Sequence, residues 1–226
     1  MPYFFQHFGV AVGALTGVLA GHGKRVDLFG VIVLAVVTGL GGGTLRDIIL
    51  DIRPIVWIRD PSLLYTAIGA AVVAFALARV WNFSGRGLLI ADGVALALYT
   101  VAGVEIAFQR QVAGVVAISM GVITGVAGGM IRDVLIGEIP LVFRRDIYLY
   151  ATASLCGSII YAMLRMFRPE STVHTWVSVG VILALRFGAI FWKWSLPLFH
   201  IKESRSVESP LGVGAPTTQS QQSSHR

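Results

Sequence analysis

Residues 38–47 read TGLGGGTLRD, and residues 124–133 read TGVAGGMIRD. The two stretches lie 86 residues apart (124 − 38 = 86), and the match continues without a gap to Pro54 and Pro140. Each copy places a glycine cluster and an Arg-Asp pair inside an apolar run. Glycine weakens a helix and a charge is costly in lipid, so both features need a reason. The pattern predicts an internal repeat with a functional site where its two halves meet.

The composition indicates a membrane protein. Hydrophobic residues make up 55% of the chain and charged residues only 13%, with a mean hydropathy of +0.76. Soluble domains carry about 25% charged residues. The net charge of +6 comes from basic residues scattered between apolar runs, which is typical of membrane flanks rather than of a nucleic-acid surface. The single cysteine, Cys156, excludes an intrachain disulfide.

Seven apolar segments are each close to the ~20 residues that cross a bilayer. They cover residues 3–21, 26–50, 62–80, 87–108, 112–137, 147–166 and 173–198. We therefore expect an all-α integral membrane protein with seven transmembrane helices. Its single transmembrane domain covers residues 1–202, divided into repeat one (3–80), repeat two (87–166) and a seventh helix (173–198). Residues 203–226 are rich in Ser, Gln, Pro and Thr, and we expect a disordered tail there.

The two repeats are expected to be inverted. Residues 9–11 and 93–95 both read GVA (offset 93 − 9 = 84), so the first segment of each repeat also matches. Three spans per repeat is an odd number, so the second repeat enters the membrane from the opposite side. Lys and Arg are more frequent on the side that holds the first, third and fifth loops. This bias predicts a cytoplasmic C-terminus and an N-terminus outside.

The glycine clusters are the first candidate site. Glycine costs about 1 kcal/mol per residue against alanine in a helix interior. Opening the helix there frees carbonyls for a cation, and amides for a carboxylate or another anion. The alternative is that the glycines only allow close helix packing. The predicted ion-contacting residues are Thr38, Gly41, Gly42, Gly43, Thr44, Thr124, Gly128 and Gly129.

The Arg-Asp pairs are the second candidate site. Neighbours on a helix point about 100° apart, so we expect Arg46 to pair with Asp133 and Arg132 to pair with Asp47 across the repeats. These pairs either line an aqueous path or only fix the packing of the repeats.

Three further charges lie within the apolar segments. Asp92 and Glu105 stand near opposite ends of the fourth segment, where they can reach the interfaces. Arg186, near the middle of the seventh segment, needs a partner or a subunit interface.

No enzyme constellation is present in the sequence. The five histidines are dispersed over termini and loops without metal-ligand spacing, and no phosphate-binding loop, nucleophile elbow or Cys/His pair occurs. The sequence therefore predicts neither an enzyme nor a cofactor, and no metal beyond a permeating ion.

The chain resembles the prokaryotic branch of the trimeric intracellular cation (TRIC) channels. The resemblance covers about residues 5–195 and rests on KRVDLFG at 24–30, GGGTLRD at 41–47, GGMIRDVL at 128–135 and EIP at 138–140. It implies seven spans arranged 3+3+1, a homotrimer in the prokaryotic inner membrane, and one potassium-permeable pore in each protomer. It also implies that the second and fifth spans kink at their glycines, where carbonyls and hydroxyls contact hydrated K⁺. The Lys-Glu-Val triplet of the animal branch is absent.

A carrier is the main alternative to a channel. Related bacterial sequences have also been described as glycine transporters, and carriers too use inverted repeats and broken helices. A channel needs a continuous hydrated path with weak ion sites, whereas a carrier needs a closed site and two alternating states. The small size of the chain favours the channel over a secondary transporter for glycine or another small amino acid.

Overall fold

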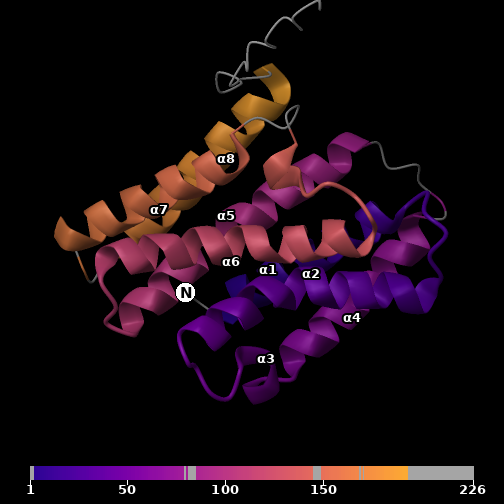
Figure 1. Ribbon diagram of the computed structural model, residues 1–226, viewed down its shortest axis with the longest axis horizontal. Coiled ribbons are helices and arrows are strands. Elements are labelled where there is room, and N and C mark those ends of the chain that lie inside the picture. The colour runs from indigo at the N-terminus through magenta and orange to yellow at the C-terminus, as the bar shows by residue number, and fades with distance from the viewer. Residues whose placement is uncertain are drawn as a thin grey trace, which may run out of the picture. The chain divides into compact units, whose positions relative to one another are not determined.

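The computed structural model of the protein describes residues 3–78, 80, 85–144, 149–167, 169 and 171–192, and within these ranges every regular element is a helix (Figure 1). Repeat one holds α1 (Tyr3–Gly21), α2 (Leu28–Ile49), the short α3 (Val56–Arg59) and α4 (Ser62–Ala78). Repeat two holds α5 (Gly85–Gln109), α6 (Gly114–Leu135), the 3-10 turn η1 (Leu141–Phe143) and α7 (Tyr150–Phe167). The last helix is α8 (Val173–Trp192). The end of the predicted seventh segment and the predicted tail (203–226) lie outside the described residues.

Five of the described helices, α1, α2, α5, α6 and α8, are long and apolar enough to cross a membrane. The helix α4 is apolar but has only 17 residues, and α7 has 18 residues. An all-helical membrane protein is therefore confirmed. Each predicted segment corresponds to one of these seven longer helices.

The helices α2 and α6 end in the same way, as the repeat predicts. The backbone N–H of Leu50 donates to the carbonyl of Arg46, and that of Ile136 donates to the carbonyl of Arg132. The next residue in each case has a positive φ, 49° at Asp51 and 71° at Gly137. The offset is again 86 (137 − 51). A left-handed residue directly after the last turn is a common way to stop a helix.

Each repeat has its own apolar core. In repeat one, Ala14, Ala35 and Ala67 are fully buried where α1, α2 and α4 pack together. In repeat two, the core between α5, α6 and α7 also takes in Ile182 of α8. The helix α8 therefore packs mainly on repeat two.

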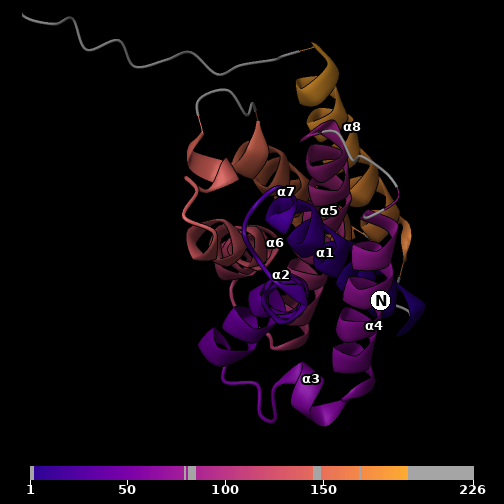
Figure 2. The ribbon, with the colours of Figure 1, turned by 90° about the vertical axis from the view of Figure 1, so that its right-hand side faces the viewer.

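The repeats meet where α2 crosses α6. Figure 2 shows the two helices side by side and nearly end-on, and they are in contact. A Cβ atom on Gly42 would overlap the carbonyl oxygen of Thr124, and a Cβ atom on Gly128 would overlap the carbonyl oxygen of Thr38. The contact is thus reciprocal, and the order of residues is reversed from one helix to the other. A reciprocal contact is the mark of a two-fold relation.

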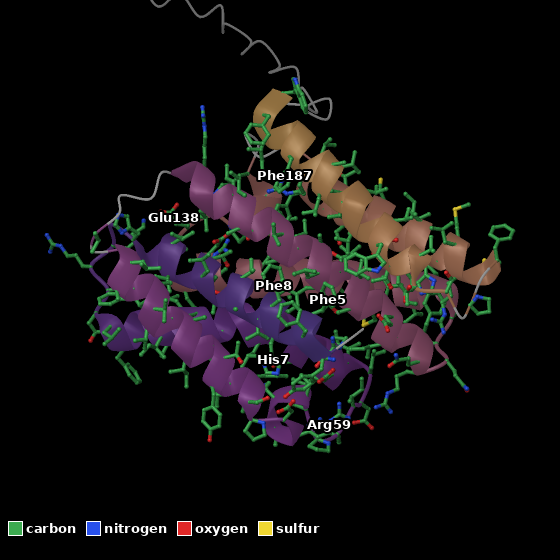
Figure 3. All side chains as sticks on the ribbon, turned by 180° about the vertical axis from the view of Figure 1, so that it is seen from behind. Phe5, His7, Phe8, Arg59, Glu138 and Phe187 are labelled. Carbon is green, nitrogen blue, oxygen red and sulfur yellow. The ribbon has the colours of Figure 1, made fainter. Side chains whose placement is uncertain are left out.

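The loops that follow α2 and α6 lie at opposite ends of the molecule. Figure 3 shows Arg59, after α2, far from Glu138, after α6. Glu138 instead forms an ion pair with Lys24, which lies in the loop between α1 and α2. The loop before α2 and the loop after α6 therefore share one end, which is the arrangement expected of inverted repeats.

Candidate functional site

The glycine clusters do not interrupt their helices. Both α2 and α6 are α-helical without a break through residues 41–43 and 128–129. The structure therefore differs from the predicted opening. The glycines serve close helix packing instead, because Gly42 and Gly128 leave room for the backbone of the opposite helix. Close helix packing was the alternative interpretation of these glycines.

The threonines of the motif bond to their own helices. The hydroxyls of Thr38, Thr44 and Thr124 donate to the carbonyls four residues earlier, at 2.5, 2.8 and 2.6 Å. Thr44 also accepts a hydrogen bond of 3.0 Å from the indole nitrogen of Trp57. Hydroxyls that return to the preceding turn are common in buried helices, and they leave no orphaned donor.

Each arginine pairs with the aspartate beside it, so the predicted pairing across the repeats is wrong. The distance from Arg46 Nη2 to Asp47 Oδ1 is 2.6 Å, and that from Arg132 Nη2 to Asp133 Oδ1 is 2.8 Å. The predicted pairing assumed that each side chain extends straight out from its helix. An arginine has a long flexible stem, so its guanidinium can fold back to a carboxylate about 100° away.

The second oxygen of each aspartate holds the segment that follows. Asp47 Oδ2 accepts a hydrogen bond of 2.9 Å from the N–H of Val56, the first residue of α3. Asp133 Oδ2 accepts one of 2.9 Å from the N–H of Leu141, the first residue of η1. These are N–H groups that a helix start leaves without an internal partner. Each Arg-Asp pair therefore fixes the loop that returns toward the next span.

Repeat two surrounds its arginine with further charges. Arg132 is fully buried, and its Nη1 donates to Asp92 Oδ1 at 3.0 Å. Asp92 itself is 4% exposed, so it lies in the protein and does not reach an interface as expected. The buried guanidinium of Arg186 lies 4.7 Å from the ring centroid of Tyr150.

This group, which we call the Arg132 cluster, consists of Arg132, Asp133, Asp92, Arg186 and Tyr150. A Cβ atom on Gly129 would lie 3.2 Å from the hydroxyl of Tyr150 and 3.4 Å from Asp92 Oδ1. The glycine therefore makes room for the cluster. The formal charges cancel, since two arginines are matched by two aspartates, as a buried group requires.

Repeat one leaves its arginine beside a cavity. The cavity has a volume of about 170 Å³, and its polar lining includes Gln6, Gly39, Gly43, Arg46, Tyr99 and Glu105. The hydroxyl of Tyr99, on α5, donates to the carbonyl of Gly39, on α2, at 2.5 Å. We call this the Arg46 cavity. Polar groups around an internal space between membrane-length helices are the features of a transport path.

The predicted glycine and threonine sites thus lie in different surroundings. Gly42, Gly128, Thr38 and Thr124 form the helix crossing, while Gly43 lines the Arg46 cavity and Gly129 borders the Arg132 cluster. Gly41 and Thr44 face a separate apolar groove that includes Trp57 and Ile131.

The sequence alone indicates no bonding partner for Tyr99 or Tyr150. Their positions in apolar helices gave one signal, since a tyrosine hydroxyl in such a place needs a partner.

Among the described residues, no group of three His, Cys, Asp or Glu side chains could hold a metal ion.

Comparisons with known proteins agree with this architecture. A family model described as "Glycine transporter" matches the chain twice, at residues 3–79 and 89–166, which are the two repeats. The UPF0126 inner membrane protein YadS of Escherichia coli is 40% identical over 206 residues, covering 90% of this chain and 99% of the relative. A UPF0126 membrane protein of Deinococcus radiodurans is 39% identical, covering 85% of this chain and 86% of the relative.

Solved structures lead to the same family. The TRIC trimeric intracellular cation channel orthologue from Rhodobacter sphaeroides superposes with a TM-score of 0.80 at 34% identity, covering 84% of this chain and 97% of that one. A second TRIC cation channel structure, concerned with conductance, gives a TM-score of 0.80 at 31% identity and covers 90% and 100% of the two chains. These relatives are membrane and channel proteins rather than enzymes. The chain therefore belongs to the prokaryotic TRIC-like family, which includes the UPF0126 membrane proteins.

Proposed function

We propose that this protein is a potassium-permeable monovalent cation channel of the bacterial inner membrane. The fold match to TRIC cation channels at 34% and 31% identity supports the channel class. The observation that carries the proposal is the Arg46 cavity, a space of about 170 Å³ with both polar and apolar lining between helices of membrane-spanning length. A charged side chain beside such a space, at membrane depth, indicates a functional site.

The ion path is proposed to run between the two repeats of one protomer. It begins at the Arg46 cavity, where Gly43 and the carbonyl of Gly39 supply backbone lining. It continues past the crossing of α2 and α6 to Gly129 and the Arg132 cluster. The hydrogen bond from Tyr99 to the Gly39 carbonyl lies across this route, so its release would free a carbonyl oxygen for K⁺. Bending of α2 and α6 at their glycines belongs to the conducting form in this proposal.

The assembly and orientation of the protein are also part of the proposal. We infer a homotrimer with seven spans per protomer, supported by the "trimeric" channel from Rhodobacter sphaeroides. The N-terminus lies outside and the C-terminus in the cytoplasm, in accordance with the loop charges. Lys24, Glu138 and Arg144 then lie on the cytoplasmic side.

The deciding experiment is potassium current through the purified protein in planar bilayers, compared with Gly42→Val and Gly128→Val. Valine would overlap the carbonyl of the opposite helix, so we expect either variant to reduce K⁺ conductance at least about tenfold. Gly69→Val is the matched control, because nothing lies within 4 Å of a Cβ atom built on Gly69. Folded Gly42→Val and Gly128→Val proteins that conduct like the parent would show that the crossing does not shape the path.

A carrier for glycine or another small amino acid is the second candidate. The matching family model is described as "Glycine transporter", although the similar solved structures are cation channels. In that case the ligand carboxylate would bind the amides freed when α2 and α6 open at their glycines, and glycine uptake into proteoliposomes would saturate with concentration. Discrete single-channel K⁺ currents without glycine uptake support the channel, whereas saturable glycine uptake without such currents supports the carrier.

A further inference from the structure

A second cavity lies outside the repeat crossing, at the end of the bundle where α1 begins and α7 ends. It has a volume of about 350 Å³ and is lined from α1, α5, α7 and α8, with Phe5, Glu105, Tyr161, Arg165, His174 and Trp176 among its residues (Figure 3 labels Phe5). Cavities that hold small ligands begin at about 300 Å³. The ion path proposed above uses neither α7 nor α8 at this end.

Two buried polar side chains, Tyr161 and His174, lie in this cavity wall. Tyr161 is fully buried, and its hydroxyl lies within hydrogen-bonding reach of Arg165 and Thr175, which line the same cavity. His174 is 6% exposed, and its Nδ1 has no hydrogen-bond partner in the described part of the chain. Buried polar atoms are nearly always satisfied, and leaving one unsatisfied costs about 1–3 kcal/mol. His174 lines the cavity, so a ligand inside it can complete the bonding of Nδ1.

The cavity wall carries both signs of charge and several aromatic rings. Arg165 lies with its guanidinium carbon 5.2 Å from the ring centroid of Phe108, which holds the cation in place. Glu105 approaches the same cavity from α5. The rings of Phe5 and Trp176 meet edge to face with centroids 5.0 Å apart, and those of Tyr161 and His174 do so at 4.5 Å.

We propose that this cavity binds a zwitterion that carries an ammonium group and an anionic group a few bonds apart. The anion would take Arg165, whose planar fork matches a carboxylate or phosphate. The ammonium would lie against the aromatic rings and Glu105, as in aromatic sites for quaternary ammonium ions. A simple anion would meet Glu105 and a simple cation would meet Arg165, so neither alone suits both walls.

Two sources offer this chemistry, a free small zwitterion and the headgroup of a zwitterionic phospholipid. The first arm of the test is calorimetric titration of the full-length protein in detergent with glycine betaine. Tetramethylammonium chloride represents the cationic half of this molecule, and sodium acetate represents the anionic half. We expect saturable binding of glycine betaine, at least about tenfold weaker binding of each half, and about tenfold weaker binding to Arg165→Gln.

The second arm measures which lipid the protein retains. Native mass spectrometry from nanodiscs of equimolar phosphatidylethanolamine and phosphatidylglycerol should show enrichment of the zwitterionic lipid, lost in Arg165→Gln. Retention of the lipid without betaine binding identifies the headgroup as the source, and betaine binding alone identifies a soluble zwitterion.

Two variants keep the test independent of folding and of conduction. Arg110→Gln is the matched control, since Arg110 is exposed and does not line the cavity. Tyr161→Phe keeps the ring but removes the hydroxyl, and we expect about threefold to tenfold weaker binding. Neither arm measures a current, so the result stands whether or not the protein conducts K⁺. Absence of both betaine binding and lipid enrichment, or equal binding to parent and Arg165→Gln, would overturn the proposal.

Discussion

Arg46 in repeat one and Arg132 in repeat two share their backbone setting but differ in what surrounds the cation. Both pair with the next aspartate, and both aspartates hold the N–H of a following short helix at 2.9 Å. Arg132 is then enclosed by Asp92, Tyr150 and Arg186, whereas Arg46 borders a cavity. The two repeats therefore share the same backbone setting, while the two ends of the proposed path differ in the charged groups around the arginine.

The largest expected effect comes from removing the arginines themselves. Arg132→Met removes the cation that pairs directly with Asp92 and Asp133 and leaves one net buried charge in the cluster, and breaking such a group costs about 3–5 kcal/mol. Arg46→Met leaves only Asp47 without its cation, and the space vacated by Arg46 adjoins a cavity that can admit water, so we expect a clearly smaller loss. Unfolding by SDS titration in mixed micelles measures both. Equal losses would remove the distinction between the two ends.

A charge-compensation cycle tests the Arg132 cluster more finely. Asp92→Asn and Arg186→Met each leave one net buried charge, so each should destabilise the protein by about 2–4 kcal/mol. The double variant restores neutrality, and we expect its loss to be smaller than the sum by at least about 1 kcal/mol. The same unfolding assay measures the four proteins. Strict additivity would show that Arg186 does not balance Asp92.

Tyr99→Phe tests the Arg46 cavity, the repeat-one side of the comparison. This change removes the hydroxyl that donates to the Gly39 carbonyl, a bond of the kind that contributes about 1 kcal/mol. If that bond holds the path closed, open probability in bilayer recordings should rise about fivefold. Tyr150→Phe is the matched control, because it alters a tyrosine of the Arg132 cluster instead. A rise in both variants would indicate general loosening.

The smallest effect is expected at the ion pair that joins the two repeats outside the membrane-spanning segments. The hydrogen bond and charge of Lys24 hold the pKa of Glu138 below its ordinary value of 4.5, with a further contribution from Arg144. This stabilisation is present above pH 4.5 and is lost as the pH falls through the lowered pKa. Unfolding measured from pH 6 to pH 3 should show a slightly flatter profile for Lys24→Met than for the parent. Identical profiles would show that the pair contributes nothing.

The sequence was sufficient to predict the repeat and the helices. A gap-free match at an offset of 86 residues needs no tertiary information. The partners of the arginines could not be predicted in the same way. Side-chain bonding of Arg46 depends on how its flexible stem folds, and the burial of Asp92 depends on how α5 is rotated about its axis. The counterpart of Asp92 in repeat one is Phe8 (92 − 84 = 8), so the repeat itself held no information on that residue.

The reciprocal crossing of α2 and α6 also bears on how such a chain could arise. A carbonyl of each helix contacts a glycine of the other at matching positions, so the surface is complementary to itself. If the two repeats arose from one ancestral copy, that copy would have held both halves of this contact, and two copies inserted in opposite directions could have formed it as a dimer. Fusion into one chain then released each copy from serving both roles. Asp92 and Arg186, which have no place in the symmetry, are the kind of change that only the fused chain permits.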